Sequence, residues 1–572
     1  MFIRNTGFHL LSVLMFALVS GCGQSRPEEA QTGAEKQSWQ TNPVAVVHWV
    51  GLKKLTAEAN AAGFLKIWRL PESERLKAQT LDKLALAPWR LSVTSTAPVD
   101  TNYAALLRQN APASLLRPLL DDLVQDECYL EIRQENKGQQ GQLALAIRLE
   151  ANRSAVWQTN LASVVESLTA AHRTPRGGGE MGHGWEIKVS DHSTTIAGLL
   201  RHVELARIGE WTIVGFAPGE NPIFVEMLHR LNNHELPFKT STANDWLQTV
   251  LDLRRLSAAF SWGWNPPEDW PRISVAAVGD GSNVLTHGEM KFPNPMSFQI
   301  EPWNIPRGLI HEPLHSFTAV QGLKPWLSSV TWWQNLHAGN APNQLFFWAQ
   351  SPTPVLDYAA APDSNAANTM TKLGGAIMDD LNPVLAENRT GKWERNPNSD
   401  GILWRAPVMA PFVQSVKLTN GPFLFAGLSP LVITNSAPPS GTIKDLLSKP
   451  NVVYFDREIT GARLEAWMYT SQLLRIIFRR AQLSSETKAI AWLKAIEPML
   501  RTSETTLTRS SPDSISIERK SSVGFTSLEL HILADWLESP RFPIQPNSVV
   551  AKLPSFTSKT SGTVLAPTNG KR

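Results

Sequence analysis

Short apolar runs bounded by turn residues alternate along the chain with longer amphipathic stretches. Apolar positions that recur every second residue predict strands, and those that recur every three or four residues predict helices. Many of the predicted strands come in pairs joined by turns, which is typical of antiparallel hairpins, whereas a doubly wound parallel sheet needs a helix after each strand. The pattern predicts an α+β fold with antiparallel-rich sheets covered by helices.

The predicted elements follow a similar order in the two halves of the chain. In the first half we expect strands at 44–50, 143–149, 185–189 and 258–262, hairpins at 207–218 and 273–292, and helices at 52–68, 72–86, 114–124, 155–172 and 224–231. In the second half we expect strands at 317–320, 345–348, 403–405 and 452–455, hairpins at 417–430 and 515–530, and helices at 370–385, 443–447, 462–482 and 486–500.

This parallel order predicts two tandem, duplicated halves, although a similar α+β rhythm without duplication is the alternative. The strongest internal match joins 207–218 to 417–430, since each contains a glycine turn, an aromatic strand and a closing proline. The early helices of the first half and the late helices of the second have no counterparts. The proline-rich segment 302–313 marks the join, so we expect halves at 42–305 and 306–538.

The N-terminus carries a short apolar run from Phe8 to Val19, preceded by Arg4 and followed by Ser20-Gly21-Cys22. A run of this length is too short to cross ~30 Å of hydrocarbon, which indicates an export signal. The segment resembles the lipobox of bacterial lipoprotein signal peptides. That resemblance implies cleavage after residue 21 and attachment of acyl chains to Cys22, and two or more chains give stable anchoring.

The resemblance implies a protein of the bacterial cell envelope that is tethered to the membrane by its N-terminal lipid. Gly23 stands where an aspartate would retain an enterobacterial lipoprotein in the inner membrane, so we expect the outer membrane, facing the periplasm. Residues 22–41 are polar and predict a flexible tether. Residues 539–572 predict a disordered basic tail rich in proline, serine and threonine.

Composition narrows the function classes. The net charge is only +3 and no nucleic-acid-binding motif is present, so we expect no nucleic acid partner. Cys128 is the only cysteine besides Cys22, lies in a strand-like run without an activating base nearby, and is expected to be a small buried hydrophobe. The 21 tryptophans are expected to fill the core, with stacking on a glycan as the alternative.

Two motifs suggest chemistry but lack the required context. His311-Glu312-Pro313-Leu314-His315 matches the H-E-x-x-H pattern of zinc peptidases, which holds both histidines on one continuous helix. Pro313 would interrupt that helix at a cost of ~3 kcal/mol, so we interpret the segment as a linker. The glycine-rich run 177–184 leads into a strand and lacks the lysine of a phosphate-binding loop.

The helix expected at 462–482 has an apolar stripe and a basic end at Arg475, Arg479 and Arg480. Such a helix could lie on a membrane, but the stripe also fits packing against a sheet, which we favour.

The sequence therefore predicts a non-enzymatic, lipid-anchored envelope lipoprotein that acts in binding or structural support. Its partners would be the membrane and an envelope protein or glycan. Alternatives are a lipid-tethered solute-binding protein of a transporter and an envelope hydrolase. We expect no catalytic, cofactor-binding or metal-binding residues, and Cys22 is the only site residue that the sequence identifies.

Mass spectrometry of the mature N-terminus tests the anchor. We expect the first residue to be Cys22 with a mass increase from acyl chains, and the Cys22→Ala variant to lose that mass because it lacks the thiol that carries the lipid. An unmodified N-terminal peptide that begins elsewhere would contradict the prediction.

Overall fold

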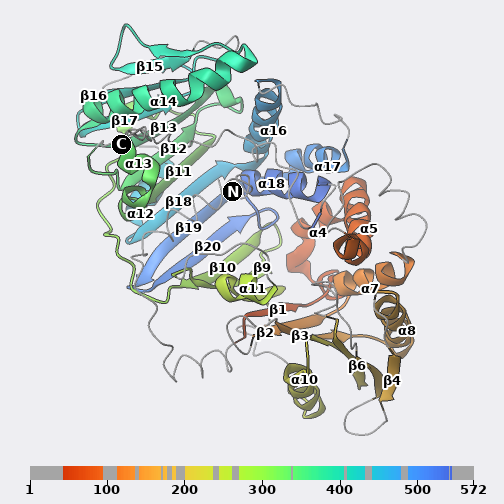
Figure 1. Ribbon diagram of the computed structural model, residues 1–572. Helices are drawn as coiled ribbons and strands as arrows, with labels where there is room; N and C mark the ends of the chain where they lie inside the picture. The colour runs from red at the N-terminus through yellow and green to blue at the C-terminus, as the bar shows by residue number, and fades with distance from the viewer. Residues whose placement is uncertain are drawn as a thin grey trace, which may run out of the picture.

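Antiparallel strand pairing organises the described chain. The computed structural model describes residues 43–93, 113–134, 141–168, 172–176, 183–188, 200–235, 244–260, 269–336, 339–404, 409–431, 441–477, 487–539 and 542–543. Within these residues twenty strands form one continuous sheet (Figure 1). Its order is β4-β5-β6-β7-β3-β2-β1-β8-β9-β10-β20-β19-β18-β11-β12-β13-β17-β16-β15-β14. Every pairing is antiparallel, so the expected α+β class is confirmed.

The first ten strands and their helices come from residues 45–291. The strands are β1 (Ala45–Trp49), β2 (Cys128–Arg133), β3 (Gln142–Arg148), β4 (His172–Arg176), β5 (His183–Lys188), β6 (His202–Ile208), β7 (Trp211–Ala217), β8 (Leu247–Asp252), β9 (Arg272–Gly279) and β10 (Val284–Lys291). The helices are α3 (Leu52–Leu55), η2 (Ala59–Ala61), α4 (Ala62–Trp68), α5 (Pro71–Val93), α7 (Ala113–Gln125), α8 (Ala151–Leu168), α10 (Pro222–Asn232) and α11 (Leu253–Phe260).

The other ten strands come from residues 316–521. They are β11 (Ser316–Gln321), β12 (Gln344–Ala349), β13 (Asp357–Pro362), β14 (Trp393–Arg395), β15 (Gly401–Trp404), β16 (Phe412–Leu418), β17 (Gly421–Gly427), β18 (Val452–Ile459), β19 (Thr502–Ser511) and β20 (Ser514–Ser521). The helices are η3 (Arg307–Leu309), α12 (Lys324–Ser329), α13 (Thr331–Leu336), η4 (Pro354–Leu356), α14 (Ala366–Asn388), α15 (Gly441–Ser448), α16 (Thr460–Ile477), α17 (Lys488–Ile496), η5 (Glu497–Met499) and α18 (Ser527–Glu538).

The two sets of strands have the same order. Adding ten to each label of β4-β5-β6-β7-β3-β2-β1-β8-β9-β10 gives the order of the other set. Helices also occupy matching places, because α8 and α14 follow β3 and β13, while α10 and α15 follow β7 and β17. The sets meet at β10 and β20, where Val284 lies opposite Ser521 and Lys291 opposite Ser514.

Helices cover both faces of each outer part of the sheet. On β7, Val214 packs in the cluster under α8 and its neighbour Ile213 packs in the cluster under α10. On β17, Phe425 belongs to the aromatic core beside α15, whereas Leu424 packs against α14. Because successive side chains of a strand point to opposite faces, each pair of helices encloses the sheet from both sides.

Two predicted strands are wrong. A strand was expected at 258–262, but residues 258–260 belong to α11. The strand in this region is β8, which comes directly before α11. The run 525–530, expected to close a hairpin with 515–519, instead enters α18, and β20 pairs with β19. Short apolar runs fit either state, and here the hydrogen bonds made by neighbouring segments decide between them.

Three further expectations need correction. The helix expected at 52–68 divides into α3, η2 and α4, because Glu58 adopts an extended backbone conformation. Strand β13 was not predicted. The run 345–348, which has the same place in the predicted order as 143–149, lies in β12, and β12 occupies the place of β2 rather than β3.

Several predicted features lie outside the described residues: the signal peptide, Cys22 and the tether, most of the basic tail, most of the glycine-rich run, and Arg479 and Arg480. None of the helices in the described part of the chain is both long and apolar enough to span a membrane.

Two glycines in equivalent strands, β7 and β17, test how tightly each sheet face is packed. A Cβ on Gly215 would lie 2.6 Å from Asn221 Nδ2 and 2.8 Å from the Phe224 ring, and a Cβ on Gly427 would lie 2.5 Å from the Tyr358 ring. We expect Gly215→Ala and Gly427→Ala each to lower the free energy of unfolding by about 1–3 kcal/mol because the added methyl overpacks the interface.

Chemical denaturation measures both changes. Gly375→Ala on α14 is the matched control, because its Cβ would meet nothing within 4 Å. Alanine favours the helix there, so this control is expected to be neutral or to stabilise by up to about 1 kcal/mol. A loss of stability at Gly375 equal to that at Gly215 would contradict the packing argument.

Candidate ligand-binding site

Helices from opposite ends of the described chain meet beside the sheet. Figure 1 shows α4 and α5, from the first set, next to α17 and α18, from the second. The Trp492 indole on α17 donates to Ser73 Oγ on α5 over 3.1 Å, and Lys83 on α5 donates to the Leu537 carbonyl on α18 over 2.5 Å. In the described residues, more helices lie between β1 and β2 than between β11 and β12, and more between β18 and β19 than between β8 and β9.

An apolar cavity of about 320 Å³ lies among these helices. Most of its lining is aliphatic or aromatic, with two hydroxyls and one lysine: Phe64, Ile67, Trp68, Ser73, Leu76, Lys77, Thr80, Leu81, Val124, Trp492, Val523, Phe525, Leu530, Leu533 and Leu537. The volume falls at the lower end of the range for small-molecule sites, and such sites are mostly apolar with a few polar groups.

Local sequence signals define where α18, which lines this cavity, begins. Thr526 Oγ1 accepts the Glu529 amide and the Glu529 carboxylate accepts the Thr526 amide, so a capping box starts the helix. Leu530 then packs with Ile67 and Leu76 of the first set and Leu493 of α17 in one buried cluster. The wall of the cavity is therefore part of a packed core.

Polar groups near the cavity are few. Lys77 Nζ lies 2.5 Å from a Glu74 carboxylate oxygen and 5.6 Å from the centre of the Trp68 ring. Phe525 is unusual for its size because 43% of it is exposed. An amphipathic molecule could bury its apolar part among the rings and leave a polar end near Lys77.

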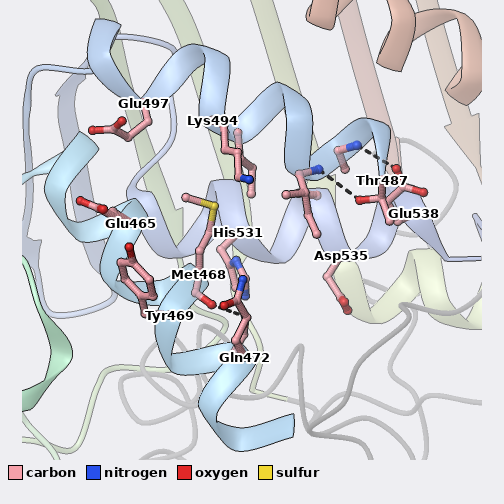
Figure 2. A pocket seen from close by; sticks show the side chains of 15 residues that line it. Glu465, Met468, Tyr469, Gln472, Thr487, Lys494, Glu497, His531, Asp535 and Glu538 are labelled. Atoms are coloured by element: carbon pink, nitrogen blue, oxygen red, sulfur yellow. Dashed lines mark hydrogen bonds between the residues drawn. The ribbon is translucent and has the colours of Figure 1, made fainter. Parts of the chain in front are cut away.

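A second cavity of about 280 Å³ lies on the other side of the α17–α18 pair, toward α16 (Figure 2). Four carboxylates line it, from Glu465, Glu497, Asp535 and Glu538, together with Lys494 and His531. Its lining is therefore net acidic. Glu538 is already engaged, since its carboxylate accepts the Ala489 amide over 2.8 Å and Gln79 Nε2 over 3.2 Å.

Two buried carboxylates lie below α18 on β18. Thr318 Oγ1 donates to Asp456 over 2.7 Å, and Ser527 donates to Glu458 from both its amide and its hydroxyl over 2.6 Å. Burial raises the pKa of Asp456 to about 7, with a further contribution from the neighbouring Glu458 charge, and burial also raises the pKa of Glu458. Paired carboxylates with raised pKa values are a feature of many catalytic sites.

The arrangement of this pair favours a structural role. Neither Asp456 nor Glu458 is among the residues that line either cavity. Glu458 accepts the first amide of α18, where the helix dipole favours a negative charge. On β20, Arg519 contacts Glu529 of the same helix through two hydrogen bonds of 2.8 and 2.9 Å. Together these contacts attach α18 to the sheet.

Of the sequence motifs, the His311–His315 segment and Cys128 lie in the described residues, and neither has the geometry of a reactive site. The segment from His311 to His315 is irregular and leads into β11, so its histidines are not one helical turn apart, as expected for a linker. Cys128 on β2 is partly buried and packs against the cluster under α8. Burial raises the pKa of its thiol to about 12, which disfavours the nucleophilic thiolate.

Comparison with protein-family models, curated proteins and solved structures finds no match to this chain.

The pKa of Asp456 predicts a pH dependence of stability. Its ordinary value is 3.8, so between that pH and about 7 the folded chain keeps a proton that the unfolded chain releases. Its contribution to stability is full below the unfolded-state value and is lost as pH rises through about 7. We expect Asp456→Asn, which keeps an acceptor for Thr318, to unfold with a free energy higher than wild type by a few kcal/mol at about pH 8.

Urea denaturation at about pH 5 and about pH 8 measures this difference, which is expected to be small at the lower pH. Asp380→Asn, the same change on the exposed surface of α14, controls for the loss of one carboxylate. An Asp456→Asn protein that is less stable than wild type at the higher pH would show that the buried carboxylate stabilises the fold in its charged form.

Proposed function

We propose that this protein is a non-enzymatic, lipid-anchored lipoprotein of the bacterial cell envelope that binds an apolar or amphipathic ligand. The observation that carries the proposal is the apolar cavity between α4 and α5 on one side and α17 and α18 on the other. The export and lipidation pattern that ends at Cys22 supports the envelope location.

The lining favours ligand binding over a reaction. Its polar groups are the hydroxyls of Ser73 and Thr80 and the ammonium group of Lys77, and Ser73 already accepts from Trp492 and donates to the Ile67 carbonyl. A ligand with an alkyl chain would gain ~0.8 kcal/mol for each CH₂ group it buries. An acyl chain fits the apolar part of the lining, and an anionic head beside Lys77 would compete with Glu74 for its ammonium group.

The tandem duplication is part of this proposal. The matching strand orders support it, and so do Gly215 and Gly427, which stand in equivalent strands opposite Ala144 of β3 and Tyr358 of β13. The helices that line the cavity lie in stretches that differ between the two sets, since α12 and α13 stand between β11 and β12 where α3, η2, α4, α5 and α7 stand between β1 and β2. Duplication would then have supplied the long sheet, and later insertions in each half would have supplied the binding site.

The antiparallel pairing throughout the described sheet argues against the alternative of a transporter's solute-binding protein, which we expected to have βαβ units.

Filling the cavity tests the binding function. We expect the wild-type protein to bind dodecanoate, measured by displacement of the fluorescent probe 1-anilinonaphthalene-8-sulfonate and by isothermal titration calorimetry. Thr80→Phe on α5 should weaken dodecanoate binding at least about tenfold, because its ring occupies space that the ligand needs, and tenfold corresponds to the loss of about 1.4 kcal/mol.

Thr371→Phe on the exposed face of α14 is the matched control, and its dodecanoate affinity should equal that of wild type. Circular dichroism and thermal melting establish that both variants fold. Equal affinities in wild type, Thr80→Phe and Thr371→Phe, or no binding of dodecanoate to wild type, would refute this site.

A further inference from the structure

A histidine and two glutamates gather on one face of the β5–β6 hairpin, away from both cavities. Glu186 on β5 lies directly opposite Glu204 on β6, and His202 precedes Glu204 by two residues, so all three side chains share one face of the sheet. One ligand atom from each lies within 4.8 Å of the others. The side chains of His202 and Glu204 are buried, with 8% and 4% exposed.

The His202 ring is held in a defined orientation by a group outside this cluster. Its Nδ1 lies 2.6 Å from the Gly219 carbonyl oxygen, which can only accept, so Nδ1 carries a hydrogen and donates it. The other nitrogen, Nε2, faces Glu186 at 2.6 Å and Glu204 at 3.9 Å. Metal-binding histidines show this arrangement, with one ring nitrogen donating to a carbonyl and the other free to coordinate.

Nε2 of His202 and the carboxylates of Glu186 and Glu204 converge on one point of this sheet face. In the ring tautomer whose hydrogen is on Nδ1, the Nε2 lone pair points toward these carboxylate oxygens, and a cation between them would satisfy all three ligand atoms. A nearby lysine, Lys188, lies 2.8 Å from Glu186 through its Nζ and is 71% exposed in water. Like charges directly opposite on neighbouring strands destabilise a sheet, so a divalent cation would relieve a repulsion that this pairing creates.

A second histidine–glutamate pair provides a contrast. His48 on β1 contacts Glu127 through Nε2 over 3.1 Å, but its ring stacks on Tyr129 and its Nδ1 has no hydrogen-bond partner in the described part of the chain. Glu127 also accepts from the Tyr129 hydroxyl. This pair has one carboxylate and no carbonyl to orient the ring, which fits an ordinary ion pair.

We propose that Glu186, His202 and Glu204 bind a divalent transition-metal ion, for which Zn²⁺ is the best match. One imidazole nitrogen and two carboxylate oxygens form a three-ligand set that zinc accepts, with water in the remaining position. The ion binds Nε2 and the two carboxylates, and so links β5 to β6. The site is independent of the proposed function, because it shares no residue with the apolar cavity.

Zinc titration of the full-length protein after EDTA treatment tests the site. We expect one equivalent of Zn²⁺ to bind by isothermal titration calorimetry and to raise the melting temperature, because the ion binds the folded chain. His202→Gln and Glu204→Gln should each weaken Zn²⁺ binding by more than roughly 100-fold. Loss of an outer-shell partner alone costs roughly 10–100-fold, and these two residues would contact the ion directly.

His48→Gln is the matched control and should bind Zn²⁺ like wild type. Co²⁺ in place of Zn²⁺ gives a visible absorption spectrum that should disappear in His202→Gln. Circular dichroism without metal separates misfolding from loss of a ligand. Absence of stoichiometric binding in wild type, or unchanged binding in a folded Glu186→Gln/Glu204→Gln double variant, would overturn the proposal.

Discussion

The antiparallel pairing of β10 with β20 is the constraint on which the rest of the structure depends. It joins ten strands from the first part of the chain to ten from the second, from Val284 opposite Ser521 to Lys291 opposite Ser514. Because both strands are interior, each has its other edge paired as well, and the described sheet is continuous. The seam also brings α18, which follows β20, next to helices that lie more than 400 residues away in sequence.

The cavity lies where helices pack on each other as well as on the sheet. Helices such as α8 and α14 pack directly on the sheet faces. In contrast, α4 and α5 meet α17 and α18, and the apolar cavity lies among them. A polar network of Glu458, Arg519 and Glu529 then fixes α18 against β18 and β20. The cavity thus has walls from both ends of the described chain, one of which is fixed to the sheet by this network.

Sequence patterns predicted much of the secondary structure but not its connections. Hairpins such as β6–β7 and β9–β10 were found because their strands are close in sequence and a turn joins them. A strand was wrongly predicted at 525–530, although the sequence there indicates the start of a helix. Thr526 and Glu529 have the spacing of a capping box. The sequence of β8, LQTVLD, does not alternate apolar and polar residues, and β13 is rich in alanine, so neither carries a strong alternating pattern. For such runs the local pattern is ambiguous and long-range pairing decides.

By itself the sequence determined the α+β class, most of the helices and hairpins, and the resemblance to a lipoprotein signal at Cys22, because all of these depend on residues close together in the chain. Only the tertiary structure decided which strands outside the hairpins are neighbours, where the apolar cavity lies, and that Glu186, His202 and Glu204 converge. The physical reason is the same in each case. Lining residues as distant as Leu76 and Leu530 are brought together by the order of strands in the sheet, and no local pattern encodes that order.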